Sequence, residues 1–203
     1  MGRVLKLTLD TNCLIDLELN EGAAAELRQL LALHDTELVA LAVPGIGASE
    51  RLPTGIYAPT FEQFHRRLRS LSAREIEILK PLAYYDITYW DWCVYAGDDL
   101  LILEEKIHRI LFPRNDFALK PESARTGLGP DGSTASWAQE LVKWRNRKCD
   151  TLGMWCHIHY QADGFVTRDG NFHKRSKKPQ LIKLGAKLIL SPEKAIALVR
   201  QAP

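Results

Sequence analysis

The sequence lacks a long apolar run, since no segment approaches the roughly 20 consecutive apolar residues of a membrane-spanning helix. Its first residues, MGRVLKLTLD, have no apolar core of the kind found in secretory signal peptides and reach an acid at Asp10. Cysteine is scarce, and no Cys-x-x-Cys pair occurs among Cys13, Cys93, Cys149 and Cys156. These absences predict a cytoplasmic protein that contacts no membrane and keeps its thiols reduced.

The chain also lacks an internal repeat and a strong net charge, which is +2 over 203 residues. The charge is unevenly distributed, because residues 143–187 hold eleven Lys or Arg and three Asp. This excess of eight positive charges leaves about six net negative charges for the rest of the chain. A basic segment on an acidic protein indicates a polyanionic partner, although a solvated face without a partner explains the charge equally well.

The apolar pattern predicts an α/β fold. Short apolar runs predict strands at 4–9, 37–43, 164–167 and 186–190. Helical patterns occupy 21–35, 60–80 with a break near Ser72, 99–113, 135–148, 150–162 as a separate helix or a continuation, 179–185 and 191–201. Residues 114–135 are rich in Pro, Gly, Ser and Asn and are predicted to form a long loop. The alternation predicts a central parallel sheet covered by helices on both faces in one domain.

Carboxylates follow the predicted strands. Asp10 ends the first strand, Glu50 follows the second in the segment ASER, and Asp169 follows GFVT. Asp150 is predicted to open a helix just before the turn into that strand. Because ligand sites in parallel sheets form beyond the carboxyl ends of the strands, these four acids are expected to gather at one edge.

Four clustered carboxylates raise one another's pKa unless a cation neutralises them. Oxygen ligands suit Mg²⁺ or Mn²⁺ better than Zn²⁺, and two such ions can activate water and stabilise the leaving oxygen of a phosphodiester. Four neighbouring basic side chains are expected to hold a nucleic-acid backbone: Lys148, Arg168, Lys174 and Arg175. The acids and the basic segment thus share one explanation.

Each acid has an ordinary alternative role. Asp10 and Asp150 can cap or electrostatically stabilise a helix N-terminus. Glu50 can be a surface charge of a loop, and Asp169 lies in RDGN, which also suits a turn. The functional interpretation therefore depends on the set of four and not on any single member.

LTLDTNCLIDL and CDTLGMWCHIHYQADGFVTRDGNF together resemble the PIN-domain family of metal-dependent nucleases. In that family a strand ends in Asp-Thr-Asn or a similar triplet, a Glu follows the second strand, and a later helix leads into a strand ending in T-x-D. The matching positions here are Asp10, Glu50, Asp150, Asp169 and the supporting Thr11, Asn12, Thr167 and Asn171. The resemblance implies an α/β/α sandwich, Mg²⁺ or Mn²⁺ as cofactor, and endoribonuclease activity, usually on single-stranded RNA.

The resemblance covers about residues 4–50 and 148–200 of a single domain, 1–203. Residues 51–147 form a mainly helical insertion that small family members lack, and a lid, a dimer surface and an RNA-guiding arm are its open roles. Glu50 is the weakest match, since RLPTGIYAP after it shows no clear helix. Its substitutes as the second acid would be Asp16, Asp98 or Asp99. A homodimer and a small antitoxin-like protein stay open as partners besides nucleic acid.

Other functions fit the sequence less well. A haloacid-dehalogenase-type phosphatase needs a second Asp where Asn12 stands. A zinc site from Cys149, Cys156, His157 and His159 competes with their burial in the core, which is favoured. The segment YYDITYWDW, residues 84–92, can stack bases but better fits a half-buried strand. Two alternatives remain: a DNA nuclease, and an inactive PIN-like module that only binds RNA or acts as a scaffold.

Overall fold

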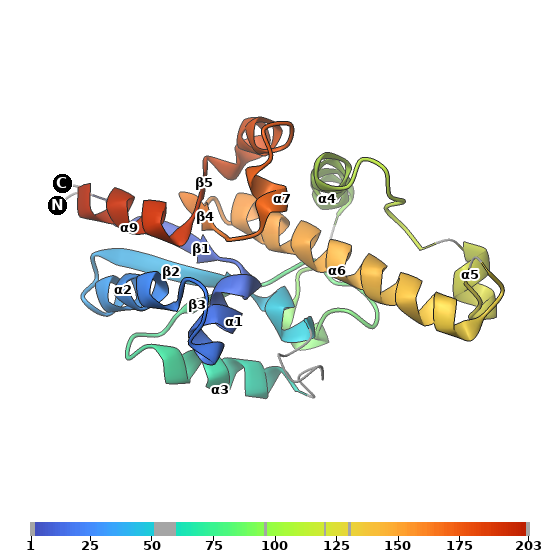
Figure 1. Ribbon diagram of the computed structural model, residues 1–203, viewed down its shortest axis with the longest axis horizontal. Helices are drawn as coiled ribbons and strands as arrows, with labels where there is room; N and C mark the ends of the chain where they lie inside the picture. The colour runs from blue at the N-terminus through green and yellow to red at the C-terminus, as the bar shows by residue number, and fades with distance from the viewer. Residues whose placement is uncertain (1–2, 51–59, 96, 120, 130, 202–203) are drawn as a thin grey trace.

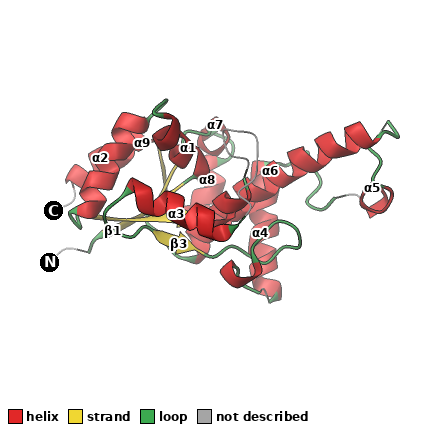
Figure 2. Cartoon of the chain, turned by 90° about the horizontal axis from the view of Figure 1, so that it is seen from below, coloured by secondary structure: helices red, strands yellow, loops and turns green. Residues whose placement is uncertain are grey.

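The computed structural model describes residues 3–50, 60–95, 97–119, 121–129 and 131–201. A five-stranded, wholly parallel sheet forms its centre, with strand order β3-β2-β1-β4-β5 (Figures 1 and 2). The strands are β1 (Leu5–Leu9), β2 (Val39–Pro44), β3 (Glu77–Leu79), β4 (Gly164–Val166) and β5 (Leu188–Leu190). The strand order reverses its direction of growth between β1 and β4, and such switch points are where α/β sheets form ligand sites.

Helices cover both faces of the sheet. The α-helices are α1 (Thr11–Leu19), α2 (Ala24–Asp35), α3 (Phe61–Leu71), α4 (Asp98–Leu111), α5 (Pro121–Thr126), α6 (Thr134–His159), α7 (Gly170–His173), α8 (Lys178–Leu181) and α9 (Pro192–Gln201). Short helical turns are η1 (Gly45–Ser49), η2 (Trp90–Trp92) and the π-type η3 (Ile182–Ala186). None of the helices in the described ranges combines the length and apolar character needed to cross a bilayer.

Two apolar cores form because strand side chains alternate between the faces. Leu7 and Leu9 of β1 enter one core with residues of α1, α2, α3 and α9. Phe165 of β4 enters the other with residues of α4, α6, α7 and α8. Thr8 also faces this second core, where its hydroxyl lies 3.1 Å from Nδ1 of His157, a buried residue of α6.

The longest helix, α6, determines how the central part of the chain meets the sheet. Between Lys148 and His157 every residue of α6 except Asp150 is buried, and the N-terminal half extends away from the sheet toward α5 (Figure 1). Helix α4 packs alongside α6 and is joined to it by a buried ion pair, in which Lys148 donates from Nζ to Oε1 of Glu104 at 2.7 Å. The hydroxyl of Tyr84 donates to the other oxygen of Glu104 at 2.5 Å.

The expected strands and the parallel α/β architecture are confirmed, and several elements differ from expectation. The helix predicted over 60–80 ends at Leu71, and residues 77–79 form the edge strand β3, because they pair with β2. Residues 84–92 form turns and η2 instead of a strand. The predicted loop 114–135 contains α5, and the region that matches no small relative, 51–147, contributes β3 to the central sheet. The segment RLPTGIYAP, residues 51–59, lies outside the described residues.

The buried ion pair gives a stability prediction. Replacing Lys148 by Met leaves the carboxylate of Glu104 without a counter-ion in the core. Breaking a buried pair from one side is strongly destabilising, so Lys148→Met is expected to lower the free energy of unfolding by about 3 kcal/mol in urea titrations. The double variant Lys148→Met/Glu104→Gln removes both charges and keeps an acceptor for Tyr84, so it is expected to recover most of that loss. A single variant as stable as the parent protein would contradict this role of the pair.

Candidate functional site

Asp10 lies at the sheet's switch point, held between β1 and β4. Its backbone N–H donates to the carbonyl of Val166 at 2.9 Å, which ties the ends of the two strands together. Its side chain N-caps α1, because Oδ1 accepts from the backbone N–H of Thr11 at 2.9 Å. Oδ2 accepts from the hydroxyl of Thr167 and from the amide of Asn12, both at 2.6 Å. The capping alternative for Asp10 is thus correct, and it leaves the carboxylate fixed at the carboxyl edge of the sheet.

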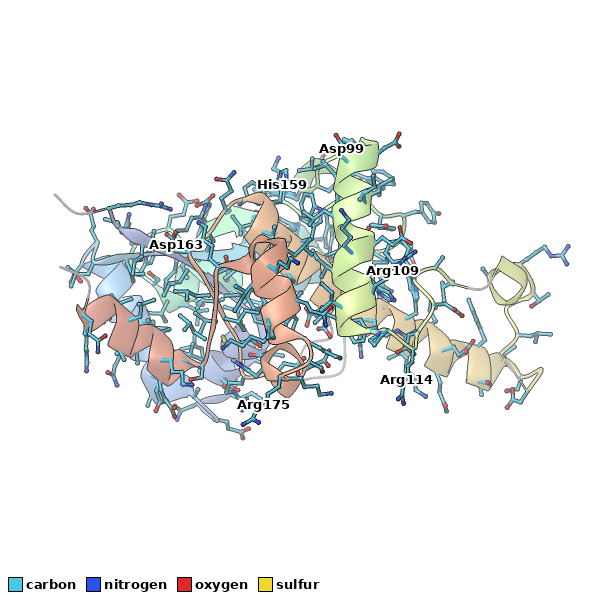
Figure 3. All side chains as sticks on the ribbon, turned by 90° about the horizontal axis from the view of Figure 1, so that it is seen from above. Asp99, Arg109, Arg114, His159, Asp163 and Arg175 are labelled. Carbon is cyan, nitrogen blue, oxygen red and sulfur yellow. The ribbon has the colours of Figure 1, made fainter. Side chains whose placement is uncertain are left out.

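Glu50 faces the same region from the end of β2. The hydroxyl of Thr11 donates to Oε1 of Glu50 at 2.8 Å, so one residue contacts both acids. Gly47 of η1 lies close to this contact, since a Cβ at that position would be 3.0 Å from the Thr11 hydroxyl. Of the three possible substitutes for Glu50, Asp16 is buried in an ion pair with Arg168, and Asp98 and Asp99 are exposed at the start of α4 (Asp99 is labelled in Figure 3).

Asp169 follows β4 and N-caps the short helix α7. Its Oδ1 accepts from the backbone N–H of Asn171 at 2.8 Å, and its own N–H donates to the hydroxyl of Thr167 at 3.0 Å. Thr167 therefore contacts both Asp10 and Asp169. The side chain of Asn171 points elsewhere, accepting from Nζ of Lys177 at 2.5 Å.

The sequence pattern predicted that Asp150 opens a helix, and this prediction is wrong. It lies well inside α6, because the helix runs unbroken from Thr134 to His159. Its carboxylate accepts no hydrogen bond from the described part of the chain, and the negative charges of Asp10, Glu50 and Asp169 act on it. Asp150 thus reaches the region of the other acids from a helix that crosses the sheet, and not from a helix terminus.

The carboxylates are electrostatically coupled. Burial raises the pKa of Asp10 to about 6, against the hydrogen bonds from Thr167 and Thr11. Burial, and then the charge of Asp10, raises the pKa of Glu50 to about 8. Burial and the charges of the other three acids raise the pKa of Asp150 well above its usual range. The groups that shift these three pKa values include no Lys or Arg of the described ranges, so no described cation offsets this negative charge.

The donor set fits a hard divalent cation in charge and ligand type. It does not form a finished cage, because the described residues include no group of three or more His, Cys, Asp or Glu side chains that could hold a metal ion. Mg²⁺ usually keeps several waters and binds through one or two carboxylates, so a complete protein cage is not required. The chemistry of the four acids thus suits Mg²⁺ or Mn²⁺, but only through one or two carboxylates at a time with water in the remaining positions.

The basic residues expected to hold nucleic acid divide into two groups. Lys148 is 2% exposed and paired with Glu104, so its assignment to nucleic-acid contact is wrong: α4 covers it. Arg168 pairs with the buried Asp16, although its own side chain is 44% exposed. Lys174 and Arg175 are exposed beyond α7, and Arg175 lies at the periphery in Figure 3.

Three of the four candidate zinc ligands, Cys149, Cys156 and His157, are buried, and His159 is half-buried. Cys149 and Cys156 are buried free thiols. The ring nitrogens of buried His157 face the hydroxyl of Thr8 and the carbonyl of Ala186, and His159 stacks on Trp155 with ring centroids 4.3 Å apart. These contacts match the favoured interpretation of the four residues as packing residues.

Two residues near the site have roles that the sequence did not predict. Asp16 fixes the loop after α1, accepting from Arg168 and from the backbone N–H of Ala23 at 3.0 Å. Lys177 links α7 to the end of α4 through Asn171 and the carbonyl of Leu111. Of these two residues, only Asp16 could have been noticed in the sequence, because it is an acid among the apolar residues Cys13, Leu14 and Leu17 of α1.

Comparisons with known proteins assign no family. No protein-family model matches this chain, and no curated protein matches it in sequence. The site must therefore be interpreted from its own geometry and chemistry.

The raised pKa of Glu50 predicts a pH-dependent stability. The Glu50 carboxyl keeps its proton up to about pH 8 in the folded state, but only up to about pH 4.5 in the unfolded state. The free energy of unfolding therefore includes a contribution from this group that is fully present below pH 4.5 and is lost as the pH rises through 8. Without divalent metal, Glu50→Gln is therefore expected to raise the free energy of unfolding at pH 9 by about 2–4 kcal/mol and to leave it unchanged at pH 4. Urea titrations at the two pH values check this, with the exposed Glu21→Gln as control. Equal behaviour of the two variants would show that Glu50 is not destabilised by its surroundings.

Proposed function

We propose that this chain is a divalent-metal-dependent nuclease of the PIN-like type that hydrolyses phosphodiester bonds. One observation carries the proposal: Asp10, Glu50 and Asp150 have raised pKa values at the sheet's switch point, and no Lys or Arg of the described ranges offsets them. Uncompensated buried charge of this kind is costly, and it is the property expected of a site that receives a cation. Perturbed carboxylates beside a switch point are also typical of functional sites.

Mg²⁺ or Mn²⁺ would be held by one or two members at a time of the set Asp10, Glu50, Asp150 and Asp169, with water in the other positions. When bound, such an ion supplies a water of lowered pKa and positive charge beside the scissile phosphate. The protein contributes orientation: Thr167 and Asn12 fix the carboxylate of Asp10, and Thr11 fixes that of Glu50. Arg168, Lys174 and Arg175 would attract the strand to this edge.

The substrate favoured is single-stranded RNA, because of the resemblance of LTLDTN and GFVTRDGNF to the PIN-domain family. DNA is the alternative, since no base-reading contact separates the two. A cytoplasmic location, a homodimer and an antitoxin-like partner stay predictions of the sequence.

A second candidate function is an inactive PIN-like module that only binds RNA. The absence of a ready-made group of three metal ligands in the described residues favours it. The raised pKa values of Asp10, Glu50 and Asp150 favour the enzyme, because a binding module gains nothing from retaining repelling carboxylates.

Cleavage assays decide between these functions. The protein is expected to cleave single-stranded RNA with Mg²⁺ or Mn²⁺ and to lose activity in EDTA. Asp10→Asn and Asp169→Asn are each expected to lower the cleavage rate at least 100-fold, an order of magnitude typical for loss of an essential charged group. A parallel DNA substrate tests the alternative substrate. Cleavage that survives EDTA and both substitutions would sink the metal-nuclease proposal, and binding without cleavage would favour the module.

Metal binding can be measured apart from catalysis. At pH 8, Mn²⁺ at about 100 times its Kd is expected to raise the free energy of unfolding by about 2.7 kcal/mol, because it binds the folded state alone. Asp10→Asn should reduce this gain, whereas Asp98→Asn, which removes an exposed acid of α4, should not. An equal Mn²⁺ effect on both variants would place the ion elsewhere.

A further inference from the structure

A polar cavity lies away from the four acids, between the chain that follows α4 and the N-terminal half of α6. Its volume is about 230 Å³, and none of the four acids lines it. Three cations line it, Arg114, Lys143 and Arg147, with two acids, Asp116 and Glu140. In Figure 3, Arg114 lies beyond the C-terminal end of α4, beside α6.

The cations of this cavity are not used by the fold. Arg114, Lys143 and Arg147 form no ion pair within the described residues, unlike Lys148, the next residue along α6. The Nε–H of Arg147 is buried and finds no acceptor in the described ranges. A buried donor without an acceptor costs free energy, so the described residues leave the hydrogen-bonding capacity of the Arg147 guanidinium partly unfilled.

One wall of the cavity is fixed to its surroundings by specific contacts. Trp144 lines it, and its indole N–H donates to the carbonyl of Phe117 at 3.1 Å. Beneath this wall, the ammonium of Lys148 lies 3.9 Å from the ring centroid of Phe117. Since Lys148 is itself fixed by Glu104, the segment after α4 is held against α6 and the cavity is preformed.

The cavity and the carboxylates share one side of α6. Lys143, Arg147 and Asp150 are spaced i, i+4 and i+7, which places them on the same helix face. The seven residues from Lys143 to Asp150 correspond to about 10 Å along the helix axis. A strand bound at the carboxylates reaches this far within a few nucleotides.

We infer that this cavity binds a phosphate group of the same nucleic-acid strand that is cleaved at the carboxylates. The inference rests on the proposed function and deepens it by assigning a second contact, a few nucleotides from the scissile bond. Three cations against two acids leave one net positive charge, which suits a single phosphate better than a run of them. Arginine guanidinium groups provide paired N–H donors that match phosphate oxygens.

Binding without cleavage tests this assignment. The dissociation constant of a fluorescently labelled single-stranded RNA is measured by anisotropy in EDTA, for the full chain and for Arg114→Gln/Lys143→Gln. The double variant is expected to weaken binding on the order of tenfold. It should also lower the slope of log affinity against log salt by about 0.7 for each phosphate that the variant no longer neutralises. Lys143→Arg keeps the charge and should retain the affinity.

The matched control is Lys194→Gln combined with Arg3→Gln, which removes the same charge from exposed residues outside the cavity. Equal reductions of affinity in the two double variants would overturn the inference, because only net charge would then matter. Unmeasurable binding of RNA to the parent protein would overturn it as well.

Two further arms separate the causes of failure. In the first arm, inorganic phosphate is added to the protein while the NMR resonance of the Trp144 indole N–H is followed. A resonance that shifts to saturation, while the double variant leaves the affinity for RNA unchanged, would mean that free phosphate is the ligand. That result would overturn the strand assignment. If the parent protein cleaves RNA and the double variant binds RNA as tightly as the parent, the phosphate-cavity inference is refuted and the nuclease proposal is not. A tenfold reduction of affinity without any cleavage by the parent protein supports the cavity and refutes the nuclease.

Discussion

The hydroxyl of Thr167 joins the two strands on which the site depends. It donates to Asp10 at the end of β1 and accepts from the backbone of Asp169 after β4, so one oxygen contacts both sides of the switch point. Without such donors, two acids at neighbouring strand ends would repel each other into solvent. Thr11 makes the equivalent link from Asp10 to Glu50. Small hydroxyl side chains thus hold the carboxylates in place while leaving their charge uncompensated.

The lysine and arginine side chains of the basic segment, residues 143–187, include both cations paired in the core and cations without an ion-pair partner in the described ranges. Lys148 is turned into the core, where Glu104 neutralises it and holds α4 on α6. Lys143 and Arg147 lie on α6 beside a cavity with no ion-pair partner in the described ranges. One helix therefore carries a structural cation, candidate ligand-binding cations and, at Asp150, a candidate metal ligand.

Local patterns were sufficient for most of the framework, because they depend on interactions between near neighbours. Continuous apolar runs located β1, β2, β4 and β5, since strands buried on both faces need apolar side chains at nearly every position. The edge strand β3 was missed because Glu77–Leu79 is too short to show a period, and its pairing with β2 is a long-range contact. The helix α6 continues through Asp150 without a break, because the residues around that position include no proline that would end it.

The sequence by itself determined the parallel α/β class and placed Asp10, Glu50 and Asp169 after their strands, because strand periodicity and strand ends are local properties. Tertiary structure decided the rest. Only the strand order brings the end of β1 beside the end of β4, and only the packing of α6 across the sheet carries Asp150 toward the other acids. Burial likewise decided which cations remain available, since the charge of a lysine in a sequence does not reveal whether a partner such as Glu104 lies 44 positions away in the chain. Charge is a property of the residue, whereas its compensation is a property of the fold.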